Sequence, residues 1–190
     1  MTLPNLAGRT IIVGVTGGIA CFKAAALVSK IAQSGARVVV CMTPAATRFV
    51  TPLTFQALSG NPVYTSPWEH VESSDPQHVA TARKADLMLI APCTMDTLAK
   101  LAHGRADDVV SLVASAVDLK KQTILLAPAM NETMWNQSST QRNVQQLRVD
   151  GFQFVGPDTG WQACRTSGVG RMAEPEEILS VVANLLTIDE

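Results

Sequence analysis

Five short apolar runs recur along this chain, and each is nearly continuous in hydrophobic residues rather than alternating with polar ones. A strand with one face in water needs a polar residue at every second position. Continuous runs therefore predict strands that are covered on both faces. The runs are Thr10–Val15, Ala36–Met42, Asp86–Ala91, Gln122–Ala127 and Phe152–Val155.

Helical patterns separate the apolar runs, and this strand–helix alternation predicts an α/β fold with a doubly wound parallel sheet. Two stretches, Ser59–Asp75 and Gly156–Met172, are predicted to be long loops, which are often functional in compact domains. The predicted helices are Ile19–Gln33, Ala45–Ser59, Gln77–Ala85, Met95–Ala102, Asp107–Ala116, Ser139–Val149 and Pro175–Leu186.

Composition limits the size of the protein and its partners. The 190 residues are 47% hydrophobic and 16% charged, enough for one well-filled core, and are predicted to form a single domain, 1–190. A net charge of −1 without a basic run argues against binding to nucleic acid. Since no apolar stretch could cross a membrane and no signal peptide opens the chain, we expect a cytoplasmic protein. Because charge is sparse, we also expect apolar surface that forms a homo-oligomer.

The four cysteines are scattered without a Cys-x-x-Cys pair. This spacing argues against a metal site and against a disulfide framework, and it fits a reducing compartment. Three of the four are expected to be small core residues. The cysteines are Cys21, Cys41, Cys93 and Cys164.

Polar residues and glycines follow the predicted strands at their carboxyl ends, which is where open α/β sheets bind ligands. Gly17 and Gly18 open the first helix, whose free N–H groups can bind an anion. Thr43 ends the second strand, where NAD-binding folds usually carry an acidic residue, so a phosphorylated mononucleotide fits better. The positions at these strand ends are Gly17, Gly18, Thr43, Pro92, Thr94, Thr97 and Asn131.

The same positions have structural interpretations. The two glycines fit a tight turn, Thr43 before a proline fits a simple turn, and Asn131 fits a helix N-cap, although its Pro-x-Met-Asn context favours a ligand site. Lys23 can approach a cofactor phosphate, but a solvated helix face is the preferred interpretation. For Asp108 a solvated N-cap fits at least as well as a place in the site.

Five segments, spread over nearly the whole chain, carry a resemblance to a known family: Thr16–Ala20, Pro92–Thr97, Pro128–Trp135, Gly156–Cys164 and Gly170–Met172. In this order they resemble the homo-oligomeric flavin-containing cysteine decarboxylases, and the Pro-x-Met-Asn-x-x-Met-Trp element is the most specific. The resemblance implies a flavodoxin-like (Rossmann-like) three-layer αβα sandwich with a parallel sheet that binds FMN. It also implies sites between the subunits of a homotrimer, sometimes assembled into a dodecamer.

Within this family the motifs are most similar to those of enzymes that decarboxylate 4'-phospho-N-pantothenoylcysteine to 4'-phosphopantetheine in coenzyme A biosynthesis. The resemblance implies a lyase whose flavin oxidises the substrate thiol to a thioaldehyde, an electron sink that lets carbon dioxide leave. A peptidyl-cysteine substrate and a non-catalytic regulatory role remain alternatives. A flavin prenyltransferase fits the Met-Asn and flap elements less well.

The resemblance also implies roles for individual residues. His78 matches an active-site histidine, which can act as a base or position the substrate carboxylate, and Cys164 matches a proton-donating cysteine on a mobile flap. Asn131 would hydrogen-bond the substrate carboxylate or amide, with Met130 and Ala163 beside it. The residues expected to contact FMN are Gly17, Gly18, Ile19, Thr43, Pro92, Thr94 and Thr97.

The chain departs from the family pattern at Arg165, where Gly commonly follows the cysteine, and at Cys93 and Met95, where small residues are usual. Arg165 either limits bending of the flap or supplies a cation for the substrate phosphate. Because the histidine, asparagine and cysteine of the site all occur in one chain, we expect an enzyme rather than a regulatory protein. The other histidines, His70 and His103, are expected at the surface, and the chain is expected to be monofunctional.

Overall fold

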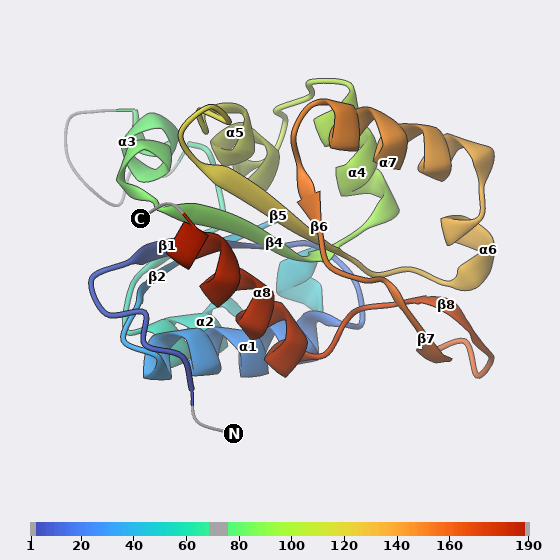
Figure 1. Ribbon diagram of the computed structural model, residues 1–190, viewed down its shortest axis with the longest axis horizontal. Coiled ribbons are helices and arrows are strands. Elements are labelled where there is room, and N and C mark those ends of the chain that lie inside the picture. The colour runs from blue at the N-terminus through green and yellow to red at the C-terminus, as the bar shows by residue number, and fades with distance from the viewer. Residues whose placement is uncertain (1–2, 69–75, 189–190) are drawn as a thin grey trace.

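The computed structural model describes residues 3–68 and 76–188, and Figure 1 shows a sheet between two layers of helices. All strand pairs in this six-stranded sheet are parallel, in the spatial order β3-β2-β1-β4-β5-β6. The predicted three-layer α/β sandwich is thus confirmed. The strands are β1 (Thr10–Val15), β2 (Arg37–Met42), β3 (Val63–Tyr64), β4 (Leu87–Cys93), β5 (Thr123–Pro128) and β6 (Gln153–Phe154).

Helices cover both faces of the sheet (Figure 1). Below it in this view lie α1 (Cys21–Gln33), α2 (Pro52–Ser59) and α8 (Pro175–Ile188). Above it lie α3 (Gln77–Lys84), α4 (Met95–Ala102), α5 (Val109–Ser115) and α7 (Ser138–Val149). Two short helices, the 3-10 turn Ala46–Arg48 and α6 (Glu132–Trp135), follow the ends of β2 and β5.

The central strand β1 shows why the apolar runs are continuous. Ile11 and Val13 are fully buried in the core under α1 and α8, whereas Ile12 is fully buried in the opposite core with α4, α5 and α7. Successive side chains point to opposite faces of a strand, so both sets of positions must be apolar when both faces are covered.

Proline divides one predicted helix. The chain over Ala45–Ser59 forms the 3-10 turn and then α2, which starts at Pro52. Proline has no N–H to donate within a helix and clashes with the preceding turn, but it is well suited to the first helical position. The remaining predicted helices occur within a few residues of their expected ends.

Both predicted loops contain strands. Val63–Tyr64 forms β3, which pairs with β2, while residues 69–75 of that loop lie outside the described residues. In the second loop, β7 (Asp158–Trp161) and β8 (Ser167–Arg171) form an antiparallel hairpin. The hairpin is short, polar and rich in glycine, so its sequence lacks the hydrophobic alternation that signals a strand.

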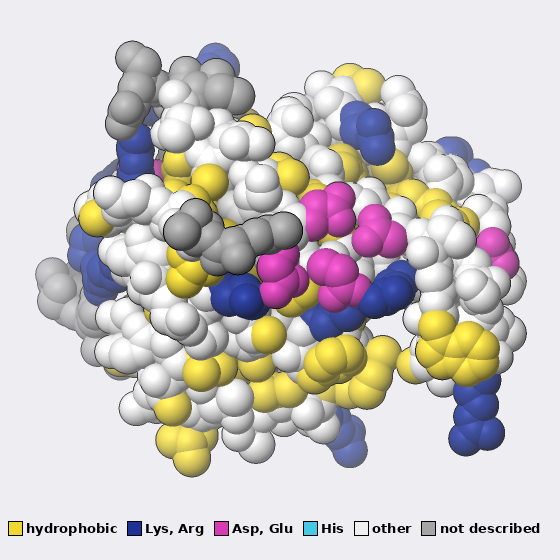
Figure 2. Space-filling model, turned by 60° about the horizontal axis from the view of Figure 1, so that its bottom comes forward, with side chains coloured by type: hydrophobic (Ala, Val, Ile, Leu, Met, Phe, Trp, Pro, Cys, Tyr) yellow, Lys and Arg dark blue, Asp and Glu magenta, His cyan; other side chains and the backbone are white. Residues whose placement is uncertain are grey.

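Ion pairs join α1 to the first turn of α8 and to the residue that precedes it. The ammonium of Lys30 lies 3.0 Å from a carboxylate oxygen of Glu176, and that of Lys23 lies 3.0 Å from Glu174. Figure 2 shows one face of the protein, where acidic and basic side chains gather beside a band of hydrophobic ones. Exposed ion pairs contribute little each, so this fastening adds to the packing of α8 rather than replacing it.

The cysteines lie as predicted, with Cys21, Cys41 and Cys93 buried and Cys164 exposed. Burial raises the pKa of the Cys41 thiol to about 12, so this thiol stays protonated near neutral pH. Over residues 3–68 and 76–188, no helix has the length and apolar character needed to span a membrane. Those residues also contain no cluster of three or more His, Cys, Asp or Glu side chains arranged to hold a metal.

Gly14 in β1 lets α5 approach the sheet, because a Cβ there would lie 2.8 Å from Cγ1 of Val110. Gly14→Ala should therefore lower the free energy of unfolding by about 1–3 kcal/mol, through overpacking. Adding Val110→Ala makes room and should recover part of that loss. Urea unfolding of the two single variants and the double variant measures the coupling, and strictly additive losses would contradict the contact.

Candidate functional site

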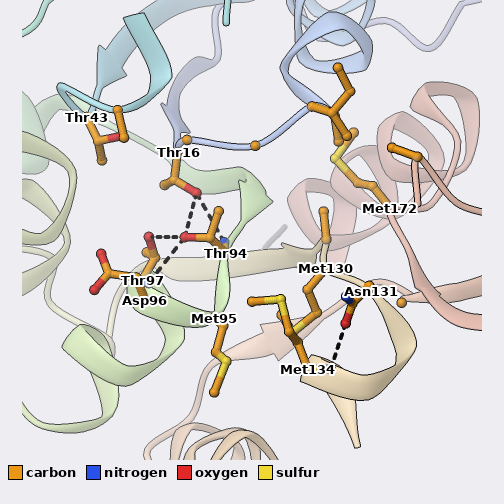
Figure 3. A pocket seen from close by; sticks show the side chains of 18 of the residues that line it. Thr16, Thr43, Thr94, Met95, Asp96, Thr97, Met130, Asn131, Met134 and Met172 are labelled. Carbon is orange, nitrogen blue, oxygen red and sulfur yellow. Dashed lines mark hydrogen bonds between the residues drawn. The ribbon is translucent and has the colours of Figure 1, made fainter. Parts of the chain in front are cut away.

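A cavity of about 1000 Å³ lies at the carboxyl ends of β1, β4 and β5. The starts of α1 and α4, the turn before α6 and the β7–β8 hairpin form its walls (Figure 3). This is the crevice in which open α/β sheets bind ligands. Ten of the predicted site residues line it: Gly17, Gly18, Ile19, Thr43, Thr94, Thr97, Met130, Asn131, Ala163 and Cys164.

Threonine hydroxyls join the ends of the two central strands. Thr16 Oγ1 donates to the carbonyl of Pro92 at 2.6 Å and accepts from the Thr94 N–H at 3.1 Å. The hydroxyls of Thr94 and Thr97 lie 3.0 Å apart (Figure 3). Pro92 itself does not line the cavity, so it supports the wall through its carbonyl. Sequence reasoning missed Thr16, although its place directly after a buried strand was a usable signal.

The turn from β1 into α1 combines a structural glycine with free backbone donors. A Cβ on Gly17 would lie 2.4 Å from Cβ of Ala45, so a larger residue would push the two loops apart. The first hydrogen bonds of α1 start at the Cys21 N–H, which leaves the N–H groups of Gly18, Ile19 and Ala20 without a backbone acceptor in the described part of the chain. Both the tight-turn and the anion-site interpretations thus keep support.

Two other predicted residues line the cavity and also accept hydrogen bonds that stabilise the local backbone. The Thr43 hydroxyl accepts the N–H of Ala46, the first residue of the 3-10 turn, at 3.2 Å, so it holds the start of that turn. Asn131 is the N-cap of α6, and its Oδ1 accepts the Met134 N–H at 2.8 Å (Figure 3). The Asn131 amide nitrogen makes no hydrogen bond within residues 3–68 and 76–188. The cap therefore fixes the side chain and leaves its donor group for a ligand.

Lys100 is surrounded by carboxylates at the cavity wall. Its ammonium lies 2.8 Å from Asp108, 3.1 Å from Asp107 and 3.2 Å from Asp96. Burial works to lower the pKa of Lys100, but hydrogen bonds to Asp108, Asp107 and Asp96 outweigh it and raise the pKa above its ordinary value. Asp108 also caps α5, as predicted, but it is buried rather than solvated.

The position of Lys23 corrects a second interpretation of the sequence, that this side chain lies on a solvated helix face. Its ammonium donates to the carbonyl of Met172 at 3.0 Å and pairs with Glu174, and its side chain is only 11% exposed. It lines the cavity instead of lying on a solvated helix face, because α1 turns this side toward the connection between β8 and α8. A lone Lys in a helical pattern gives no sequence signal for such a contact.

The hairpin closes the cavity on the side of Cys164. It is fastened to the α6 turn by a hydrogen bond of 2.9 Å from the Met130 N–H to the carbonyl of Gly170. Arg165, at the tip, is the non-glycine residue with a positive φ, +66°, among those described. The left-handed conformation costs a side-chain-bearing residue about 1 kcal/mol, a cost that glycine at this position would avoid.

His78 lies apart from the cavity. It is half-buried in the first turn of α3, and α3 and the β7–β8 hairpin lie at opposite ends of the molecule in Figure 1. One chain therefore does not bring His78 to Cys164, and the role of His78 stays a prediction. His103 is exposed after α4, as expected, and His70 lies outside the described residues.

A parallel sheet with a ligand-sized cavity at the ends of its central strands defines an α/β protein of the flavodoxin-like class. The sequence model of one protein family, described as Flavoprotein, matches residues 2–187. The chain belongs to this flavoprotein family.

Among the curated relatives is the coenzyme A biosynthesis bifunctional protein CoaBC of Haemophilus influenzae, 42% identical over 183 residues, which are 96% of this chain and 45% of that protein. The protein of the same name from Bacillus subtilis is 43% identical over 176 residues, 93% of this chain and 43% of that protein. The chain thus spans about half the length of the curated relatives it matches.

Solved structures share the whole fold. A PPC decarboxylase mutant complexed with pantothenoylaminoethenethiol matches with a TM-score of 0.85 at 28% identity, over 94% of this chain and 98% of that one. The FMN-dependent cysteine decarboxylase SpaF matches with a TM-score of 0.82, also at 28% identity, over 97% of this chain and 98% of that one.

Lys100→Met should destabilise the protein by about 3 kcal/mol, because it leaves the buried carboxylate of Asp108 without its cation. Lys120→Met is the matched control, since Lys120 is exposed and has no ion pair among the described residues. It should change stability by less than about 0.5 kcal/mol. Urea unfolding at pH 7 measures both, and equal effects would show that the carboxylate cluster does not depend on Lys100.

Proposed function

We propose that this protein is an FMN-dependent lyase that decarboxylates 4'-phospho-N-pantothenoylcysteine to 4'-phosphopantetheine in coenzyme A biosynthesis. The observation that carries the proposal is the meeting of Asn131 and Cys164, from separate segments, in one cavity of about 1000 Å³. The likeness to CoaBC proteins and to a PPC decarboxylase bound to pantothenoylaminoethenethiol supports this substrate class. A cytoplasmic location is part of the proposal.

The residues of the cavity fit FMN. The N–H groups before α1 suit its phosphate, and the end of β2 offers Thr43 rather than the carboxylate that dinucleotide folds place there. Met95, Met130 and Ile19 provide apolar surface for a flat ring. When bound, the flavin would supply the oxidation of the substrate thiol to a thioaldehyde and its reversal after carbon dioxide has left.

Asn131 and Cys164 would have different roles, in substrate binding and in proton transfer. The amide nitrogen of Asn131, held in place by the cap of α6, would donate to the substrate carboxylate or amide. The Cys164 thiol, on the hairpin, would return a proton to the substrate carbon after decarboxylation. The hairpin would exclude water from that step. This division of roles supports an enzyme over a regulatory flavoprotein.

His78 would come from a second copy of the chain. Since α3 lies far from the hairpin within one chain, a histidine at this site would have to be supplied by a neighbour across a subunit interface (Figure 1). We therefore include a homotrimer, or a dodecamer built from trimers, in the proposal. Within it, His78 would act as a base toward the substrate thiol or position its carboxylate.

A peptidyl cysteine is the second candidate substrate. It remains a candidate because SpaF, as similar to this chain in identity as the PPC decarboxylase structure, is named as an FMN-dependent cysteine decarboxylase and not as a PPC decarboxylase. Trp161, exposed at the mouth of the cavity, could contact a peptide as readily as a pantothenoyl arm.

The first test is anaerobic incubation of the FMN-loaded protein with 4'-phospho-N-pantothenoylcysteine, with loss of carbon dioxide followed by mass spectrometry. Asn131→Asp should lower kcat/KM by about 10- to 100-fold, because it replaces a donor by a charge that repels the substrate carboxylate. Asn136→Asp, at the other end of α6, is the matched control and should keep activity. No product from a yellow, folded wild type would redirect the proposal to a peptide substrate or a regulatory role.

A second test concerns the copy that supplies His78. His78→Asn and Cys164→Ser should each be inactive alone, but co-expression should restore about a quarter of the activity, because a site shared by two copies can draw one intact residue from each. Turnover of the mixed, purified oligomer measures this. A mixture as inactive as its parents would mean that both residues act from the same chain.

A further inference from the structure

Gln162 is a buried polar residue on an otherwise exposed hairpin. It is 7% exposed, whereas Trp161 beside it is 66% exposed and Ala163 and Cys164 are also exposed. An amide withdrawn from water must find hydrogen-bond partners within the protein, so its contacts show what it holds together.

The side chain of Gln162 uses all of its hydrogen-bonding capacity. Its Nε2 donates to the carbonyls of Gly168 at 3.2 Å and Val169 at 3.0 Å. Its Oε1 accepts the Glu132 N–H at 3.2 Å and the Cys164 thiol at 3.5 Å. One oxygen thus links the flap cysteine to the turn that carries the substrate-binding amide.

We propose that Gln162 is a positioning residue that orients the Cys164 S–H group relative to Asn131. The inference rests on the proposed function. An amide oxygen only accepts, so the contact with Cys164 exists only while Sγ carries the proton. When the thiol delivers that proton, its S–H bond breaks and a C–H bond forms at the substrate carbon that lost carbon dioxide. The second C–H bond, at the sulfur-bearing carbon, would take its two electrons as a hydride that a bound, reduced flavin would supply.

Docking of the hairpin does not depend on Gln162 alone. The Met130 N–H donates to Gly170 at 2.9 Å, and the Val169 N–H donates to the Glu132 carboxylate at 3.4 Å. A Cβ on Gly170 would lie 2.4 Å from the Met130 carbonyl oxygen, so β8 lies directly against this turn. The Cys164 thiol also lies 3.0 Å from the Thr166 hydroxyl. Removing the Gln162 oxygen should therefore release the thiol from the α6 turn, while its contact within the hairpin and the docking of the hairpin remain.

The test compares two substitutions of Gln162. Gln162→Met keeps the length of the side chain and removes the acceptor for Cys164. Gln162→Glu keeps an oxygen for the thiol and loses the donors to the β8 carbonyls. If the acceptor matters, only Gln162→Met should release the oxidised, decarboxylated enethiol in place of 4'-phosphopantetheine, with the product ratio shifted on the order of tenfold. In a single turnover, carbon dioxide release should stay within about twofold of wild type, because an enzyme that releases the enethiol keeps a reduced flavin and cannot begin a second turnover without an oxidant.

A second readout needs no cofactor or substrate. Because the other three cysteines are buried, iodoacetamide labelling of the flavin-free protein followed by intact mass reports on Cys164. Labelling should be severalfold faster in Gln162→Met than in wild type, and close to wild type in Gln162→Glu. If Gln162→Met does not fold, Gln162→Asn makes the same test by withdrawing the oxygen by one methylene.

The outcomes are distinguishable. Equal labelling rates and equal product ratios in wild type and Gln162→Met would overturn the inference, as would the same shift in both variants, which would assign the effect to hairpin anchoring. A wild type that forms no product would overturn the proposed function, while the labelling comparison would still decide whether Gln162 holds the thiol.

Discussion

The buried hydrogen bond from Thr16 Oγ1 to the carbonyl of Pro92 joins β1 to β4 at the point where the chain leaves the sheet in opposite directions. From β1 the chain turns to α1 on one face, and from β4 it turns to α4 on the other. Diverging connections open a crevice that no side chain of the sheet fills. Fixing these two ends fixes both helix starts, and the remaining walls are built onto them.

The charges along the crevice differ from one wall to another, and this difference orients an anionic ligand. On the side of α4 and α5, three carboxylates surround the single ammonium of Lys100, so that wall keeps a negative excess. At the start of α1, the N–H groups of Gly18, Ile19 and Ala20 have no backbone acceptor among the described residues. An anionic ligand is repelled by the first wall and attracted by the second. The same field would turn the phosphate of FMN toward α1 in the proposed complex.

The sheet could be predicted from the sequence because strands that are buried on both faces are hydrophobic at every position, as at Ile11 and Ile12. Sequence reasoning also recovered the residues at the strand ends, whose place follows from topology. It missed β7–β8, whose stability comes from backbone contacts with the α6 turn rather than from a hydrophobic face. The contacts of Lys23 and Gln162 were missed for a related reason. Both side chains donate to backbone carbonyls, and since every residue has a carbonyl, no residue type in the sequence marks the partner.

The mouth of the cavity connects the site to assembly. Ile19, Phe22 and Trp161 line it and are 59%, 61% and 66% exposed, an apolar group that a lone chain leaves in water. Burying such a group against a neighbour is favourable, and it would also exclude water from the reacting atoms. In the proposed oligomer, the subunit contact that brings His78 to the cavity would thus also exclude water from it. Assembly and the completion of the active site would then be one event, with a common dependence on protein concentration.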